Sequence, residues 1–284
     1  MARRATAIKQ LRKQNPHTLV LDAGNALTGQ DIANQSRGQA VVEAMNLMGY
    51  DALALGALEL ELSAAELRAA IDQAQFEVLS ANTVVSDTGK LFTDPYAVVK
   101  VGGRRVGLLG LTTPRTRNPD LLVKDPLAAA QEYVPQLAKE TDLIVVLSNA
   151  GLKVNQQIAA QVPGIDVIVG AGGKTVLEQP QVIDLAKART LLVQAGYEGR
   201  WLGVLRLELD GDHTITDYVG ELWPLNRTVA DDPEMVALIN RYKASLNVVP
   251  TPAWTVAPPP PATRLVSPTP TVAPESYPSP SPGP

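Results

Sequence analysis

The chain has 284 residues, with 25 lysines and arginines and 29 aspartates and glutamates, so its formal net charge is −4. This acidic balance disfavours nucleic acid as a partner. The absence of cysteine excludes disulfides, iron–sulfur clusters, thiolate zinc sites and cysteine nucleophiles. The only histidines are His17 and His213, which leaves little material for a histidine-rich metal centre. No apolar run approaches the ~20 residues of a membrane span, so we expect no transmembrane segment.

Short apolar runs rich in β-branched residues predict the strands of an α/β domain. These runs occupy 18–21, 51–55, 76–79, 106–111, 143–147, 166–169 and 191–193. Most are apolar on both faces, which is typical of central strands that are covered by helices on both sides.

Amphipathic stretches between these runs predict helices over 37–48 and 64–75. Ser63 and Glu66 stand three residues apart at the start of the second stretch, which is the arrangement of a capping box. The alternation of strands and helices predicts a largely parallel sheet with right-handed crossovers.

The C-terminal part of the chain changes character twice. Between Leu202 and Leu222 the apolar residues alternate around Asp210-Gly211-Asp212, which predicts an antiparallel hairpin. From Pro250 to Pro284 the chain holds 13 of its 23 prolines. Because proline fixes φ and removes backbone donors, we predict one domain over 1–246 and a disordered Pro/Ser/Thr-rich linker or tail over 247–284.

Four predicted strands end in short glycine-containing loops, at 22–25, 56–59, 148–151 and 170–175. In open α/β sheets, ligands bind beyond the carboxyl ends of the strands. We therefore expect these four loops to share one rim that holds the site.

Several segments together resemble a known family. They read LDAGNALTGQ, RGQAVVEAMNLMGYDALALGALELE, FEVLSANTV, GLLGLTTP, LIVVLSNAGL, GIDVIVGAGGKT and LLVQAGYEGRWLG. In this order and spacing they resemble the N-terminal metallophosphatase (calcineurin-like) domain of 5'-nucleotidases and UDP-sugar hydrolases over roughly 3–245. The resemblance implies a four-layer sandwich of two mixed sheets flanked by helices. Because Met1 begins in the helix that should follow the first strand, we expect that strand to be missing from this sequence.

The resemblance also implies which positions would hold two divalent metal ions. Members of the family use a D-x-H on the first strand, the last Asp of a GD pair, the Asn and His of GNHE, a His in LSHxG and two His in GGHSH. This chain differs at each of these positions that it contains, which are Asn25, Ala57, Leu58, Asn149, Gly172 and Lys174. Leu58 stands where the resemblance places the catalytic His.

The replacing residues are poor metal ligands. Asn25 offers one neutral carbonyl in place of a bridging carboxylate, and Ala57, Leu58 and Gly172 offer no side-chain donor. The charge of Lys174 would repel a cation. We therefore expect no catalytic residue, no metal ligand and no cofactor. We expect Asp22 and Asn25 to cap the turn and the following helix, and Glu59 to accept hydrogen bonds within its loop.

The glycine loop over 170–175 allows one alternative. Gly172, Gly173, Lys174 and Thr175 could hold a phosphate or sulfate through backbone amides and the lysine. A P-loop is excluded because G-x-x-x-x-G-K-[ST] requires glycine where Ile168 stands, and G-x-G-x-x-G would need glycine in place of Thr175.

Three functions stay open at this point. The first is a non-catalytic structural or binding module on a flexible stalk, with an unknown protein partner or a linked module beyond the tail. The second is a metal-dependent phosphoester hydrolase of the 5'-nucleotidase type, completed by residues outside this chain. The third is a weak anion or nucleotide binder that uses the glycine loop. The resemblance implies a periplasmic or cell-surface location, although the basic N-terminus lacks the apolar segment of a signal peptide.

Overall fold

The structure is a computed structural model that describes residues 1–185 and 188–246. The predicted linker over 247–284 lies outside the described residues, so this division of the chain stays a prediction. The described helices are α1 (Ala2–Gln14), α2 (Asp31–Gln35), α3 (Gln39–Met48), α4 (Ala64–Ile71), α5 (Pro126–Leu137), α6 (Leu152–Gln161), α7 (Pro233–Ser245) and the 3-10 helix Glu59–Glu61. None of the described helices is long and apolar enough to cross a bilayer.

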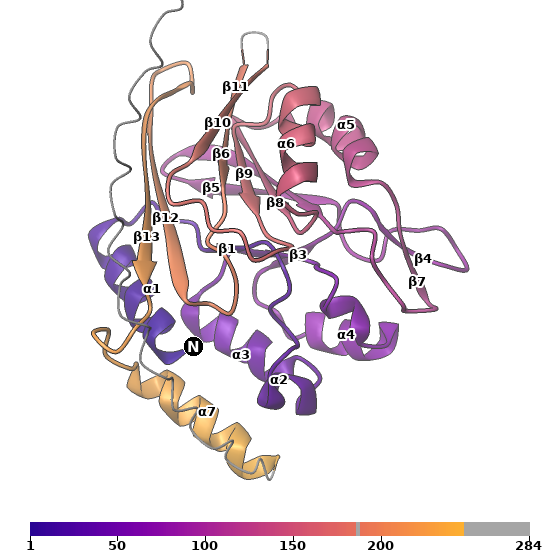
Figure 1. Cartoon of the computed structure of the whole chain (residues 1–284), viewed down its shortest axis with the longest axis vertical. Helices are drawn as coiled ribbons and strands as arrows, with labels where there is room; N and C mark the ends of the chain where they lie inside the picture. Colours follow the sequence, from indigo (N-terminus) through magenta and orange to yellow (C-terminus); the bar gives the residue numbers. More distant parts are fainter. Residues whose placement is uncertain (186–187, 247–284) are drawn as a thin grey trace, which may run out of the picture. The chain divides into compact units, whose positions relative to one another are not determined.

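The strands form a three-stranded sheet, a six-stranded sheet and two antiparallel pairs of strands (Figure 1). We call the first two the small sheet and the large sheet. The small sheet has the order β1-β2-β3, and all its pairs are parallel. The large sheet has the order β10-β11-β9-β8-β6-β5, with parallel pairs in the centre and an antiparallel strand at each edge. The antiparallel pairs are β12–β13 and β4–β7. The bounds are β1 (Leu21–Asp22), β2 (Ala52–Ala54), β3 (Glu77–Leu79), β4 (Thr83–Val85), β5 (Tyr96–Val101), β6 (Arg104–Leu111), β7 (Leu121–Val123), β8 (Leu143–Ser148), β9 (Val167–Gly170), β10 (Gln181–Leu185), β11 (Ala188–Val193), β12 (Trp201–Leu209) and β13 (Ile215–Pro224).

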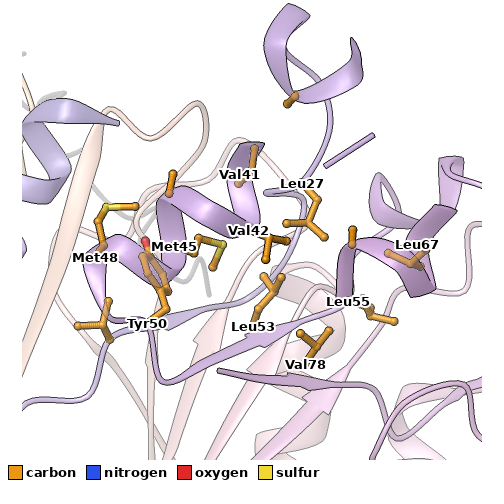
Figure 2. Packing of buried hydrophobic residues seen from close by; sticks show 14 of the residues in the cluster. Leu27, Val41, Val42, Met45, Met48, Tyr50, Leu53, Leu55, Leu67 and Val78 are labelled. Atoms are coloured by element: carbon orange, nitrogen blue, oxygen red, sulfur yellow. The ribbon is translucent and has the colours of Figure 1, made fainter. Parts of the chain in front are cut away.

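Strand alternation sorts the apolar side chains into the layers of a sandwich. On β2 and the residue after it, Leu53 and Leu55 face the helices, whereas Ala52 and Ala54 face the large sheet. Figure 2 shows Leu53 pointing toward Val42 of α3, within the cluster that joins the small sheet to α1, α3, α4 and α7. The small alanines let the two sheets approach each other closely.

Two further clusters complete the sandwich. Leu108, Val145 and Leu191 of the large sheet pack between the two sheets. Ile144 and Ile168 point the other way, against α5 and α6, which lie together in Figure 1. The predicted α/β class and the four-layer sandwich are therefore confirmed. The predicted hairpin also forms, and the Asp210 Oδ1 atom accepts the N–H groups of two residues in its turn.

Three predicted boundaries were wrong. The strand predicted over 18–21 pairs with β2 only at Leu21–Asp22; at Val20 the carbonyl accepts the backbone N–H of Asp51 (2.8 Å), while the Val20 N–H donates to the side-chain Oδ2 atom of Asp51 (2.7 Å). The helix predicted over 64–75 begins with the expected Ser63 capping box but ends at Ile71. The helix predicted from 37 begins at Gln39, after Gly38 at φ 83°.

Candidate functional site

The rim loops after β1, β2, β8 and β9 meet as predicted, and they pack backbone against backbone. Gly24 has φ +93°, and a Cβ atom there would lie 2.7 Å from the carbonyl oxygen of Ala54. A Cβ atom on Gly56 would collide with the side-chain oxygen of Asn25 and approach Asn149 to 2.9 Å. Glycine is therefore required at both positions, because no side chain fits between the loops.

Glu59 is the centre of this arrangement. Its side chain is 0% exposed, and its carboxylate accepts four backbone N–H groups. Oε1 accepts from Ala26 (2.6 Å) and Leu27 (2.9 Å), while Oε2 accepts from Asn25 (2.8 Å) and Gly56 (2.7 Å). Glu59 accepts hydrogen bonds as predicted, but only the Gly56 donor belongs to its own loop, and the other three donors lie in the loop after β1. Both oxygens are used to fasten the loop after β1 to the loop after β2.

Asn25 occupies the left-handed region, with φ 64°. Its Oδ1 atom accepts the N–H of Leu58 at 2.9 Å. The prediction that Asn25 caps the following helix was wrong, because α2 starts only at Asp31 and the amide turns toward the neighbouring loop instead. The side chain thus joins the same two loops as Glu59.

Asn149 follows β8 and is 1% exposed. Its Oδ1 atom accepts the N–H of Ala57 (3.3 Å), and its Nδ2 atom donates to the carbonyl of Ala23 (3.1 Å). This carboxamide uses both an acceptor and a donor, so Asn149 ties the large sheet to both loops of the small sheet.

The glycine loop after β9 lies against Asn149. Gly172 has φ +85°, and a Cβ atom there would collide with the backbone carbonyl oxygen of Asn149. The loop backbone therefore fills the space that a side chain at this position would need. Gly173 has open space around it, and Lys174 is exposed, with its Nζ atom 5.6 Å from the ring centroid of Tyr197. The carbonyl of Thr175 accepts a hydrogen bond from Gln194 (3.0 Å).

Asp22 lies on the helix-covered side of β1, near Arg4 of α1, a neighbour that the sequence did not predict. Its Oδ1 atom accepts the N–H of Gly24 at 3.0 Å, which confirms the predicted turn cap. Burial raises the pKa of Asp22 to about 6, although the nearby Arg4 guanidinium lowers it. Arg4 reaches from α1 and donates to the hydroxyl of Tyr50 at 3.4 Å. An isolated sequence offers no signal for this cluster, because its members lie far apart along the chain.

A second buried polar group lies behind the rim and was also missed. Ser148 donates to the Oδ1 atom of Asn155 at 2.6 Å, and both residues are 0% exposed. Among residues 1–185 and 188–246, no group forms a hydrogen bond with the Nδ2 atom of Asn155 or the Oε1 atom of Gln194. A Cβ atom on Gly170 would come within 2.8 and 2.9 Å of these two atoms, so this glycine leaves room for the amides.

Both histidines lie at the opposite end of the strands from the rim. His213 sits in the turn between β12 and β13 and contacts Arg104, which begins β6. His17 lies against Gly102 in the turn before β6. Neither histidine can reach the rim at the carboxyl ends of the strands.

The rim residues do not fit a pair of divalent metal ions. Metal ions of this kind need several free carboxylate oxygens or imidazole nitrogens. The oxygens of Glu59, Asn25 and Asn149 instead accept backbone N–H groups. Within 1–185 and 188–246 there is no group of three or more His, Cys, Asp or Glu residues that could hold a metal ion.

Comparison with known proteins identifies the family. No family model matches the chain. The chain is 32% identical over 273 residues to 5'-nucleotidase from Bos taurus, in an alignment that covers 87% of this chain and 47% of that protein. The crystal structure of a 5'-nucleotidase precursor from Thermus thermophilus matches with a TM-score of 0.81 and 32% identity, over 87% of this chain and 53% of that one. The chain belongs to the 5'-nucleotidase family of metallophosphatases.

Other 5'-nucleotidase relatives agree with this assignment. Snake venom 5'-nucleotidase from Gloydius brevicauda is 31% identical over 274 residues, covering 87% of this chain and 46% of the venom protein. The calcineurin-like phosphoesterase YfkN from Bacillus subtilis, at 21% identity, shares the fold with a TM-score of 0.75 over 87% of this chain and 89% of its own. The chain thus spans about half the length of the curated relatives it matches.

Proposed function

We propose that this 5'-nucleotidase-family domain is a non-catalytic module whose metal-binding rim has become a structural clasp. The observation that carries the proposal is where the polar atoms of the rim point. Glu59 accepts four backbone N–H groups, and the Asn25 and Asn149 amides join the backbones of neighbouring loops. These side chains hold the loops together directly, which is the task that bound cations perform in metal sites.

The donor chemistry supports the same conclusion. Ala57 and Leu58 carry no polar side chain, and the backbone at Gly172 leaves no room for one. Two-metal hydrolysis needs cations about 3.5–4 Å apart that polarise the phosphoryl oxygens and activate water. At the positions of this chain where the resemblance places metal ligands and the catalytic His, the residues offer neither a carboxylate nor an imidazole. The proposed role is therefore that of a rigid body that presents its surface to a partner or to a linked module.

A hydrolysis assay tests the proposal. The purified chain would be mixed with AMP or with a bis-aryl phosphate, in the presence of excess Mn²⁺ or Zn²⁺, beside the Thermus thermophilus 5'-nucleotidase as a positive control. We expect no hydrolysis above the metal-only blank. Hydrolysis that EDTA abolishes would contradict the proposal and would favour the metal-dependent hydrolase instead.

We also propose that the domain works outside the cytoplasm, at the periplasm or the cell surface. The support is the similarity of this chain to other members of the family, among them two proteins named snake venom 5'-nucleotidase. Fractionation of cells that express the natural gene would test it, with the protein expected among the periplasmic or surface proteins. Recovery only with the cytoplasmic fraction would contradict it.

A further inference from the structure

The chain contains two N-x-[ST] triplets that the proposed function does not use. They are Asn34-Gln35-Ser36 and Asn226-Arg227-Thr228, and neither has proline at its middle position. This triplet is the acceptor sequence for N-linked glycosylation, in which the asparagine receives the sugar and the serine or threonine is required for recognition. Because such triplets also arise by chance, their surroundings in the fold decide whether each one is an acceptor.

The triplet at Asn226 lies in the loop between β13 and α7, and all three of its residues are exposed. The Oδ1 atom of Asn226 accepts the N–H of Thr228 at 2.9 Å and the hydroxyl of Thr228 at 2.7 Å. This Asx turn holds the hydroxyl beside the carboxamide. In the part of the chain that the structure describes, the Nδ2 atom of Asn226 donates no hydrogen bond. The nitrogen that receives a sugar in this reaction is therefore free and open to solvent.

The loop is fixed to the domain on both sides of this triplet. The N–H of Leu225 donates to the carbonyl of Arg200 (2.9 Å), and the carbonyl of Ala230 accepts the hydroxyl of Thr6 from α1 (2.8 Å). Within the described residues, the side chains of 226–228 form no hydrogen bond or ion pair outside the triplet. An oligosaccharide on Asn226 would therefore extend into solvent without displacing a packed side chain.

The triplet at Asn34 is held in a different way. Asn34 lies in α2, and its Oδ1 atom accepts the N–H of Gly29 at 2.8 Å. Ser36 is only 8% exposed, and its hydroxyl donates to the carbonyl of Ala33 (3.2 Å) and accepts the N–H of Ala40 (3.2 Å). An enzyme that must contact this hydroxyl cannot reach it in the folded domain. The chain thus carries an internal control for the exposed triplet.

We propose that Asn226 is a site of N-linked glycosylation and that Asn34 is not modified in the folded chain. The sugar donor is an oligosaccharide linked to a polyisoprenyl diphosphate. A C–N bond forms between the anomeric carbon of its first sugar and the Nδ2 atom of Asn226, which loses one proton. The C–O bond to the diphosphate breaks, and the lipid diphosphate leaves with the electron pair. The proposal rests on the proposed location outside the cytoplasm, where such oligosaccharides are transferred.

Transfer in vitro tests the acceptor separately from the location. The full chain would be produced without glycosylation, purified in its folded form, and incubated with a single-subunit oligosaccharyltransferase of N-x-[ST] specificity and its lipid-linked oligosaccharide. Mass spectrometry of the intact chain and of its peptides locates the product. Synthetic peptides of residues 29–39 and 221–231 are measured beside it, because in short peptides neither triplet is held by the fold. Circular dichroism confirms that the chain and its variants are folded.

We expect one oligosaccharide per folded chain, on Asn226, whereas both peptides are modified. Asn226→Gln should abolish transfer, and Asn34→Gln should leave it unchanged. Thr228→Ala should slow transfer at least about tenfold, because the enzyme loses the hydroxyl that it recognises, and Thr228→Ser should restore it.

Three results would each overturn the proposal. The first is a folded chain that remains unmodified, and the second is transfer to Asn34 at a rate comparable to that of Asn226. The third is a peptide of residues 29–39 that is no better an acceptor than Asn34 in the folded chain, since the fold would then not select between the triplets. A chain found only in the cytoplasm, but modified in vitro, would contradict the proposed location and, with it, glycosylation in the natural cell.

Discussion

Replacing Glu59 by glutamine tests the clasp at its centre. Glu59→Gln keeps the shape of the side chain but turns one of its two oxygens into an NH₂ group. Each oxygen accepts two backbone N–H groups, so two of the four buried donors would face a donor instead of an acceptor. Hydrogen bonds to a charged group contribute ~1.5–3 kcal/mol each, so we expect a loss of about 3 kcal/mol or more in the free energy of unfolding.

Urea unfolding followed by circular dichroism measures this loss. With an m-value of roughly 2.5 kcal/mol per M, a loss of about 3 kcal/mol shifts the midpoint down by ~1.2 M. Glu61→Gln is the matched control, because Glu61 lies in the same 3-10 helix but is exposed. An exposed substitution of this kind should change stability by less than ~0.5 kcal/mol.

The comparison has a clear negative outcome. If Glu59→Gln shifts the midpoint no more than Glu61→Gln does, the carboxylate does not hold the rim loops together. The interpretation of the rim as a structural clasp would then be wrong.

Three further substitutions test other parts of the structure. Gly172→Ala should destabilise by about 3 kcal/mol, because its φ is +85° and the new methyl group would collide with Asn149, whereas Gly173→Ala, in open space, should stay within ~0.5 kcal/mol; equal urea midpoints for the two variants would contradict this geometry. Ser63→Ala removes the side-chain half of the capping box and should cost ~1 kcal/mol in thermal or urea unfolding, and an unchanged midpoint would refute the cap. Burial raises the pKa of Asp166 to about 6, so its protonated form favours folding and this contribution is lost as the pH rises from about 4 through 6. Asp166→Asn should therefore gain about 1–2 kcal/mol over the natural chain at pH 7.5 but not at pH 4, and a gain that does not change with pH would contradict the assignment.

The sequence predicted correctly those helices and strands whose formation depends on residues close together in the chain. The apolar run at Leu143–Ser148 and the Ser63 cap were recognised because their signals lie within a few residues. The end of α4 could not be predicted in this way. There, Asn46 accepts the N–H of Gln75 (2.8 Å) and donates to the carbonyl of Gln73 (2.8 Å), so a distant side chain ends the helix.

The candidate site shows the same division. The glycines at the strand ends predicted that the four loops share one rim. The apolar side chains of Ala57 and Leu58 predicted that these positions offer no metal ligand. The new roles of Asn25 and Asn149 were not predictable, because an amide's partner depends on which loop lies opposite in the folded chain. The Asn25 amide spans 33 residues of sequence to reach Leu58, and Asn149 spans 126 to reach Ala23.

Metal content is the most direct test of the central claim. The purified chain would be incubated with excess Mn²⁺ or Zn²⁺, freed of unbound metal by gel filtration, and examined by inductively coupled plasma mass spectrometry beside the Thermus thermophilus 5'-nucleotidase. The clasp at Glu59, Asn25 and Asn149 predicts far less than one ion per chain. Two tightly held ions per chain, lost on treatment with EDTA, would contradict it.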